Sequence, residues 1–325
     1  MPSLKEIKNR IASVNNTRKI TSAMKMVASS KLHHAQVMIE NMIPYEGMLE
    51  HILKTFIASD SDIKYHLDLG LEHSETKHVA IIVFSSNSSL CGGFNANIIK
   101  TMQNTVEDYT AQGVSVTIYP IGKKIAEKAV KLGYKIAGDF NALADKPNAN
   151  DCQAIGRELR AQFLKGELNR VELLYHHFKS AGTQILTHKQ LLPIDIEEAM
   201  NYDHYRDLES NIATEKTINY QRAKDKKRVE EYEYKAGHSL NSNFIVEPNL
   251  ETILNALIPR YVNLMIYTAL LDSNASEHAA RMVAMQTATD NADELLRQLS
   301  LQYNKSRQQA ITSELLDIVG GSVNN

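Results

Sequence analysis

The 325-residue sequence contains no tryptophan, and aromatic residues make up only 6% of it. A large compact core usually buries several big aromatic side chains, so this scarcity hints at an elongated protein. Only two cysteines occur, Cys91 and Cys152, far apart and in unlike contexts. They form neither a disulfide framework nor a zinc-binding spacing, and a reducing compartment fits them.

Strong charge and long apolar runs are also missing. The formal net charge is −2, which gives no global field to recruit nucleic acid or an anionic membrane. No run approaches the roughly 20 apolar residues needed to cross a bilayer, and the N-terminus lacks the apolar core of a secretory signal. With 43% hydrophobic and 23% charged residues, the composition predicts a soluble protein that is not exported.

The first 58 residues show apolar side chains at alternating steps of three and four, which predicts a coiled-coil helix. Ser3 and Glu6 are spaced as a capping box at its start. The first run is Leu4, Ile7, Ile11 and Val14; after a polar stretch a second run comprises Ile20, Met24, Val27, Ala35, Met38, Met42, Tyr45, Leu49, Ile52 and Phe56. The change of phase between the two runs predicts a register shift.

Residues 249–321 repeat this pattern and predict a still longer helix. Its seam would comprise Leu250, Leu254, Leu257, Tyr261, Leu264, Leu271, Ala275, Ala279, Met282, Thr289, Ala292, Leu296, Leu299 and Tyr303. The pair Gly320 and Gly321 predicts its end. Since an apolar seam is unstable in water, we expect the two terminal helices to pair antiparallel as a coiled coil. The surplus length of the second helix would then need another protein around it.

Between the helices, residues 76–195 alternate strands and helices, which predicts an inserted open mixed α/β sheet of Rossmann-like type. The expected strands are residues 78–85, 114–119, a short one near 134, and an antiparallel edge hairpin of 170–179 and 183–192; the expected helices are 96–111, 123–132 and 151–165. Residues 196–248 form a charged insertion with five tyrosines, which we expect to pack loosely on the α/β domain.

Few residues suggest chemistry. The run SSLCGGFN, residues 88–95, lies between a strand and a helix, where phosphate can bind, but it matches neither nucleotide-binding motif and favours a tight structural turn. Cys91 has no nearby histidine partner and is expected to be structural. The pairs His33-His34 and His176-His177 point their rings apart on a helix and a strand, so neither predicts a metal site. No catalytic residue, metal or cofactor is predicted.

The first 35 residues are basic, with seven Lys or Arg against one acid, a net charge of +6. These are Lys5, Lys8, Arg10, Arg18, Lys19, Lys25 and Lys31, with Glu6 as the acid. A basic helical face suits acidic loops of a protein partner. It also suits nucleic acid or a transit peptide. The heptads continue past a plausible cleavage point, and the segment has no aromatic residue for base stacking.

Residues 3–32 and 275–321, with LCGGFN between them, closely resemble the gamma subunit of F-type ATP synthases. The resemblance implies a non-catalytic central stalk whose coiled coil stands inside a ring of alpha and beta subunits. It implies an α/β foot that rests, with epsilon, on the membrane-embedded c-ring, at the cytoplasmic face of the bacterial inner membrane. Rotation of the shaft would couple proton flow to ATP synthesis or hydrolysis at the beta subunits.

The resemblance also implies which residues meet the stator. Its motifs place these contacts at Met24, Lys25, Arg281, Arg307, Gln308, Thr312, Glu314, Asp317, Ile318 and Val319. Asn87, Ser88 and Ser89 depart from the family's usual Asp-Arg-Gly, and the segment 196–248 is longer than in common bacterial members. The cysteine pair of the redox-regulated chloroplast form is missing.

Two other readings stay open from the residues. The chain could be a stand-alone α/β nucleotide- or phosphate-binding protein that dimerises through its coiled coil. It could also be a nucleic-acid binder that uses its basic helix. Calorimetry with ATP and a gel shift would discriminate these readings from a rotor.

Overall fold

The computed structural model describes residues 3–59, 76–194, 247 and 249–323. Its contacts separate into two compact units. Unit 1 comprises Met1–Ser30 and Arg281–Asn325, and unit 2 comprises Lys31–Ala280. Two long helices, α1 (Leu4–Ser59) and α8 (Leu250–Val323), each contribute residues to both units. The predicted insertion at 196–248 lies almost wholly outside the described residues.

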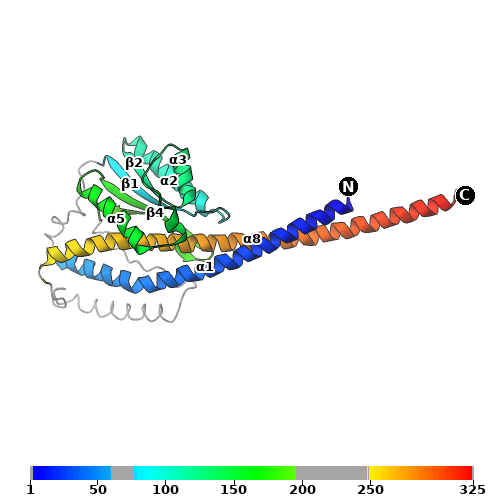
Figure 1. Cartoon of the computed structure of the whole chain (residues 1–325), viewed down its shortest axis with the longest axis horizontal. Helices are drawn as coiled ribbons and strands as arrows, with labels where there is room; N and C mark the ends of the chain where they lie inside the picture. Colours follow the sequence, from blue (N-terminus) through cyan, green and yellow to red (C-terminus); the bar gives the residue numbers. More distant parts are fainter. Residues whose placement is uncertain (1–2, 60–75, 195–246, 248, 324–325) are drawn as a thin grey trace. The chain divides into compact units, whose positions relative to one another are not determined.

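Unit 2 contains a five-stranded mixed sheet, as predicted (Figure 1). The strands are β1 (His78–Phe84), β2 (Ser115–Ile121), β3 (Lys135–Ile136), β4 (Arg170–Ser180) and β5 (Thr183–Leu192). Their order is β3-β2-β1-β4-β5, with parallel neighbours except for the β4–β5 hairpin. The antiparallel edge hairpin is therefore confirmed.

Helices cover both faces of this sheet. They are α2 (Phe94–Ala111), α3 (Lys123–Lys131), α4 (Asn141–Asp145) and α5 (Ala149–Leu164), of which only α4 was not predicted. Because strand side chains alternate between faces, β1 divides its residues between two cores. Ala80, Ile82 and Phe84 join a core with α5 and α8, whereas Ile81 and Val83 join a core with α2 and α3.

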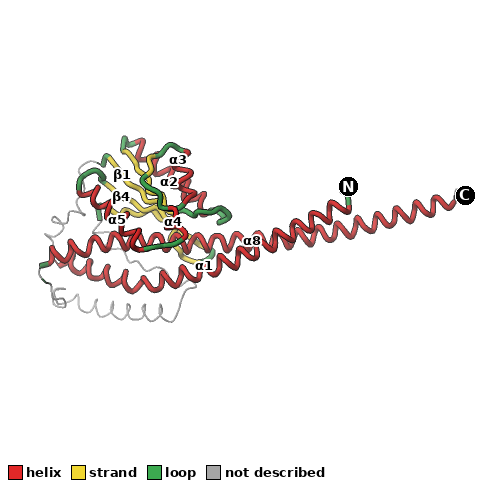
Figure 2. The backbone as a smooth tube through the Cα atoms, in the orientation of Figure 1, coloured by secondary structure: helices red, strands yellow, loops and turns green. Residues whose placement is uncertain are grey.

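The parts of α1 and α8 in unit 2 belong to the core on the α5 side. Leu49 and Leu53 of α1 are buried together with Leu254, Ile258 and Val262 of α8. Burying a leucine-sized side chain contributes about 1.5 to 3 kcal/mol, so these contacts anchor both helices to the α/β segment. Because they share this core, the two helices lie side by side here (Figures 1 and 2).

Unit 1 is an antiparallel pair of helices from the two ends of the chain, as predicted (Figure 2). Ser3 caps α1, since the Glu6 backbone N–H donates to Ser3 Oγ at 3.2 Å. Arg18 contacts Asp293, and Thr21 contacts Thr289. Higher numbers on α1 thus meet lower numbers on α8, which establishes the antiparallel direction.

The predicted register shift in α1 is wrong. Side chains on the inner face follow one unbroken alternation of three and four, and all of them are buried or half-buried: Ile7, Ile11, Val14, Arg18, Thr21, Lys25, Ala28, Leu32, Ala35, Ile39, Met42, Glu46, Leu49 and Leu53. The predicted seam residues Ile20, Val27 and Tyr45 are instead 60%, 58% and 50% exposed. The seam does not break at the polar stretch, because polar residues occupy it there.

The predicted end of α8 is also wrong. The helix continues through Gly320 and Gly321 to Val323. Glycine costs a helix only about 1 kcal/mol relative to alanine, which does not by itself end a long helix. By length and composition, part of α8 reaches the level of a membrane span, which the sequence analysis did not expect. Half of that window is buried inside the protein, as in the core helix of a soluble protein.

A buried carboxylate ties β4 to its neighbours in unit 2. Glu172 is only 4% exposed and accepts hydrogen bonds from Tyr109 Oη of α2 and His188 Nε2 of β5, the latter at 2.7 Å. Burial by itself would raise the pKa of Glu172. The two hydrogen bonds and the charges of His188 and Arg170 outweigh burial and lower this pKa below its ordinary value of 4.5.

We expect the Glu172→Gln variant to have a flatter acid dependence of stability than the parent chain. A carboxylate whose pKa is lowered by folding stabilises the protein fully above pH 4.5, and this contribution is lost as the pH falls through the lowered folded-state pKa. At neutral pH the free energy of unfolding of the variant should be lower than that of the parent by about 1 to 3 kcal/mol. Urea unfolding between pH 7 and pH 3 measures both effects, with the exposed Glu107→Gln as control. Parallel pH profiles for the parent and Glu172→Gln would contradict the assignment.

Candidate partner-binding surface

All ten residues predicted to meet a partner fall in unit 1. Met24 and Lys25 are half-buried on α1, and Arg281 of α8 is only 9% exposed. Four residues near the end of α8 are exposed: Arg307, Gln308, Thr312 and Glu314. Asp317, Ile318 and Val319 continue the backbone of α8, but their side chains lie outside the described residues.

The end of α8 runs past the start of α1. The contacts Thr21–Thr289 and Arg18–Asp293 place α1 residue i beside α8 residue 310 − i or 311 − i. By this register Leu4 lies beside Ser306, and α8 residues beyond 310 have no counterpart on α1. In agreement, every side chain from 311 to 316 is exposed. The predicted surplus of the second helix is therefore present in unit 1.

Three of the six residues from 311 to 316 at this unpaired end are apolar. Ile311, Leu315 and Leu316 are 49%, 57% and 65% exposed. Isolated apolar residues on a surface are ordinary, but three within six residues on one unpaired helix end are typical of a partner-binding surface. Neither the apolar periodicity nor the family motifs predicted these three residues as contacts. Their lack of a counterpart follows only from the register.

A second apolar group lies on the outer side of α1. Ile20, Met26 and Val27 are 60%, 64% and 58% exposed. Exposed basic side chains accompany them, among which are Lys5, Lys8, Arg10 and Lys19. Apolar anchors beside lysine and arginine suit a protein partner that offers apolar pockets and acidic loops. The apolar residues that suggested a shifted seam are thus the outward-facing ones.

The edge of the sheet where α/β proteins usually bind phosphate is closed by the chain itself. At the start of α3, the backbone N–H of Lys123 donates to Asn87 Oδ1 at 2.8 Å, and that of Ile125 donates to Ser85 Oγ at 3.0 Å. The Lys124 N–H donates to the Ser86 carbonyl at 3.2 Å. These are the donors with which a helix start would hold an anion. Asn87, which departs from the family pattern, therefore caps α3.

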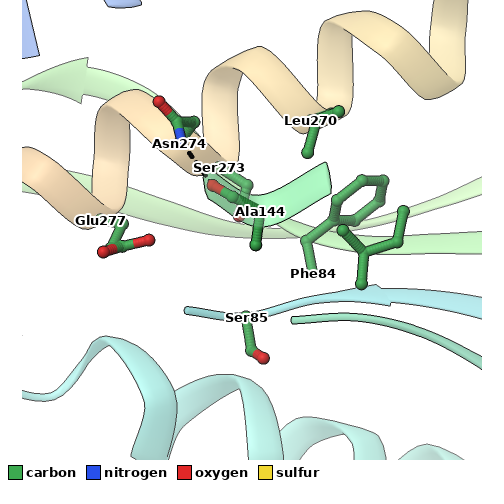
Figure 3. Close-up of a pocket in the computed structure, with 8 residues that line it drawn as sticks. Phe84, Ser85, Ala144, Leu270, Ser273, Asn274 and Glu277 are labelled. Atoms are coloured by element: carbon green, nitrogen blue, oxygen red, sulfur yellow. Dashed lines mark hydrogen bonds between the residues drawn. The ribbon is translucent and has the colours of Figure 1, made fainter. Parts of the chain in front are cut away.

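Helix α8 fills the remaining space at this edge (Figure 3). A cavity of about 10 Å³ remains between the ends of β1 and β2, α4 and α8, with Glu277 of α8 on its lining. Asn274 Nδ2 closes one side by donating to the Ala144 carbonyl at 2.8 Å. Such a volume holds roughly one water molecule, and a carboxylate there would repel phosphate. This geometry disfavours the nucleotide- or phosphate-binding reading.

The other candidate chemical groups have structural surroundings. Cys91 is buried, and its Sγ lies 3.1 Å from Asn95 Nδ2. His176 stacks on Phe94 with ring centroids 4.4 Å apart, and burial lowers its pKa to about 4, so the ring is neutral at physiological pH. His177 points to the opposite face, where Nδ1 lies 2.9 Å from Asp272 Oδ2. The predicted divergence of the two histidines is confirmed.

Together these features favour a structural subunit whose helical pair has surfaces suited to protein partners. A pair of terminal helices presents apolar and basic surfaces, while the α/β sheet has its usual ligand edge closed. Among the described residues, no cluster of His, Cys, Asp or Glu could hold a metal ion.

Comparison with known proteins identifies the family. The family model described as ATP synthase matches residues 3–323. The ATP synthase gamma chain of Phocaeicola vulgatus is 48% identical over 99% of this chain and all of the relative, and that of Bacteroides thetaiotaomicron is 46% identical over the same shares. The chain belongs to the ATP synthase gamma chains, and its role is that of the non-catalytic central stalk.

Solved structures agree on the fold. A chain from the Euglena gracilis mitochondrial ATP synthase, in a structure of OSCP, F1 and c-ring, has a TM-score of 0.59 at 18% identity and covers 98% of this chain and 93% of its own length. A chain from the Tetrahymena thermophila central stalk and c-ring has a TM-score of 0.54 at 24% identity, with coverages of 83% and 99%. At these identities the likeness concerns the fold.

Proposed function

We propose that unit 1 turns inside a ring of ATP synthase alpha and beta subunits, and that the α/β segment is the foot that contacts the c-ring and epsilon. Proton flow through the c-ring would then drive ATP synthesis at the beta subunits, on the cytoplasmic face of a bacterial inner membrane. The observation that carries this proposal is the exposed apolar end of α8, residues 311–316, which has no counterpart on α1.

The proposal extends to the organisation of the chain. Residues 1–58 and 249–321 would serve as the shaft, 76–195 as the foot, and 196–248 as a separate insertion. The parallel order β3-β2-β1-β4 supports a Rossmann-like origin for the foot. The closed ligand edge supports a purely mechanical use of that fold.

The proposed contacts divide into two groups along unit 1. Met24, Lys25 and Arg281 would contact beta-subunit loops near the middle of the helical pair, with Ile20 and Val27 beside them. The residues near the end of α8 would enter the top of the ring. These are Arg307, Gln308, Thr312, Glu314, Asp317, Ile318 and Val319.

Co-expression with alpha and beta subunits tests the function directly. We expect a stoichiometric complex that purifies together and whose ATPase activity depends on this chain. The isolated chain should bind neither ATP in calorimetry nor DNA or RNA in a gel shift. Failure to form a complex with alpha and beta subunits from the same organism would contradict the proposal.

Single polar substitutions on the shaft should have modest effects. An exposed ion pair contributes about 0.2 to 1 kcal/mol, well below the several kcal/mol per step that coupling to ATP must transmit. We expect Arg307→Gln and Gln308→Ala, both at exposed positions and made one at a time, to lower coupled ATP synthesis by no more than about threefold. Membrane vesicles with the assembled enzyme provide the assay. Complete loss of activity from either change, with assembly intact, would contradict torque spread over many contacts.

A further inference from the structure

We propose that four residues of unit 1 form a register lock that sets the axial position of α8 against α1. Thr21 Oγ1 lies 2.8 Å from Thr289 Oγ1, and Arg18 Nη1 lies 2.9 Å from Asp293 Oδ1. They act as positioning residues. The importance of this lock for coupling rests on the proposed rotor function, whereas the lock itself does not.

Next to these contacts the seam carries small residues, which by themselves specify register only weakly. Ala28 of α1 is 1% exposed, and Ala292 of α8 is 7% exposed. Large knobs that fill matching holes fix the relative position of two helices, but alanines fit almost equally well after a slide. A polar group in the seam has a partner in one register only, which is how coiled coils commonly specify alignment.

The hydrogen bonds of the two threonines are mutually consistent. Thr289 Oγ1 lies 2.8 Å from the Met285 carbonyl and donates its proton there. Its lone pair can then accept the proton of Thr21, whose alternative acceptor is the Arg18 carbonyl at the longer distance of 3.1 Å. Since Thr21 is only 9% exposed, water competes poorly for this contact.

Other registers lack these partners. A slide of one heptad would bring Leu296 opposite Thr21 and Ser300 opposite Arg18. A slide in the other direction would bring Met282 and Gln286 to the same places. In either case the buried hydroxyl loses its cross-helix partner and the guanidinium loses its carboxylate.

The neighbouring acids of α8 are already engaged within their own helix. Asp290 accepts from Gln286 Nε2 at 2.6 Å, and Glu294 accepts from Arg297 and Gln298 at 3.0 and 2.9 Å. Asp293 is the acid that meets α1. The ion pair is therefore specific to one position on α8.

A slide of one heptad would also change the unpaired end of α8. Seven residues of helix correspond to about 10 Å, so the apolar end would extend that much farther from α1 or withdraw by that much. A surface that must fit a surrounding protein does not tolerate such a change.

Disulfide formation in the full-length chain measures the register. We expect the pair V14C/L296C to report the observed register and V14C/Y303C a slide of one heptad. The native cysteines are buried and should not compete. The measured quantity is the oxidation rate of V14C/L296C divided by that of V14C/Y303C. In the lock-free variant, which combines T21V, T289V, R18A and D293A, this ratio should fall at least fivefold. An unchanged ratio would overturn the lock.

Two further variants separate a lock from general stability. The charge swap R18D/D293R, with both threonines kept, should restore the ratio to within twofold of the parent. The control D290N removes an acid of the same helix whose carboxylate accepts from Gln286 within α8, and should leave the ratio unchanged. If the ratio of oxidation rates in R18D/D293R is no higher than in R18D alone, the role of the ion pair in the lock is overturned. Should the lock-free variant not fold, D293N and T289V must each lower the ratio.

The assay needs no partner subunit, so the lock and the proposed function can fail independently. In the assembled enzyme, the lock-free variant should lower ATP synthesis at least threefold relative to ATP hydrolysis. An unchanged ratio of synthesis to hydrolysis would overturn the role in coupling while leaving the measured register intact.

Discussion

Replacing Leu315 and Leu316 together by aspartate is expected to weaken assembly with alpha and beta subunits at least thirtyfold. Both side chains are more than half exposed on the unpaired end of α8. Each buried leucine contributes about 1.5 to 3 kcal/mol, and 1.4 kcal/mol is a factor of ten in affinity. A carboxylate forced into an apolar contact adds a further penalty.

Titration of the full-length variant against alpha and beta subunits, followed by gel filtration, measures this loss. The matched control is Val130→Asp on α3, because Val130 is 67% exposed but belongs to unit 2. Its complex should form as in the parent. Equal assembly of the double variant and the parent would show that the end of α8 is not gripped, and the central observation behind the proposed function would be lost.

Gly122→Ala is expected to destabilise unit 2 by about 3 to 5 kcal/mol. Gly122 has a φ of 107°, and an added Cβ would lie 2.2 Å from the Ser85 carbonyl oxygen. That oxygen belongs to the backbone just after β1, so it cannot move aside without disturbing the sheet. The same position precedes α3, where Ser85 and Asn87 supply the capping groups.

The control Gly133→Ala isolates the steric part. Gly133 also has a positive φ, 75°, but an added Cβ would meet nothing within 4 Å. Gly133→Ala should lower the free energy of unfolding by only about 1 to 2 kcal/mol. Because the chain lacks tryptophan, urea unfolding is best followed by tyrosine fluorescence or far-UV circular dichroism. Similar losses of unfolding free energy for the two variants would mean that the contact between residue 122 and the Ser85 carbonyl does not limit the side chain at that position.

The closed ligand edge of the sheet and the exposed end of the helical pair both involve helix α8. Helix α8 passes the carboxyl ends of β1 and β2 and places Ser273 and Glu277 where an α/β protein would bind phosphate. The same helix supplies the exposed end in unit 1. A fold often used for binding small ligands is here tied to a helix whose other part carries the exposed apolar residues that we propose a partner binds.

Local patterns were sufficient to predict most elements. The apolar run at 78–85, the hairpin of 170–192 and both long helices follow from periods of two and of three to four. The Ser3 cap, the opposed directions of His176 and His177, and the structural role of Cys91 also follow from local rules. These features depend on neighbours in sequence, which is why they are readable without a structure.

The seam of α1 between Val14 and Ala28 was not readable in this way. Apolarity pointed to Ile20 and Val27, but the structure places half-buried Arg18 and buried Thr21 on the inner face and leaves those two residues outside. A hydrophobic pattern assumes that the inner face is the apolar one. It cannot recognise a polar residue whose partner, Thr289 or Asp293, lies 268 or 275 residues away in the sequence.

The sequence by itself determined the two terminal helices, their pairing, the mixed sheet and the family, because each rests on repeating local patterns or on long motifs. Only the tertiary structure decided which face of α1 is covered, where α8 loses its counterpart, and that Asn87, Ser85 and Glu277 close the ligand edge. The physical reason is that burial and hydrogen bonding belong to pairs of residues, and their distance in space is settled only when the whole chain has folded.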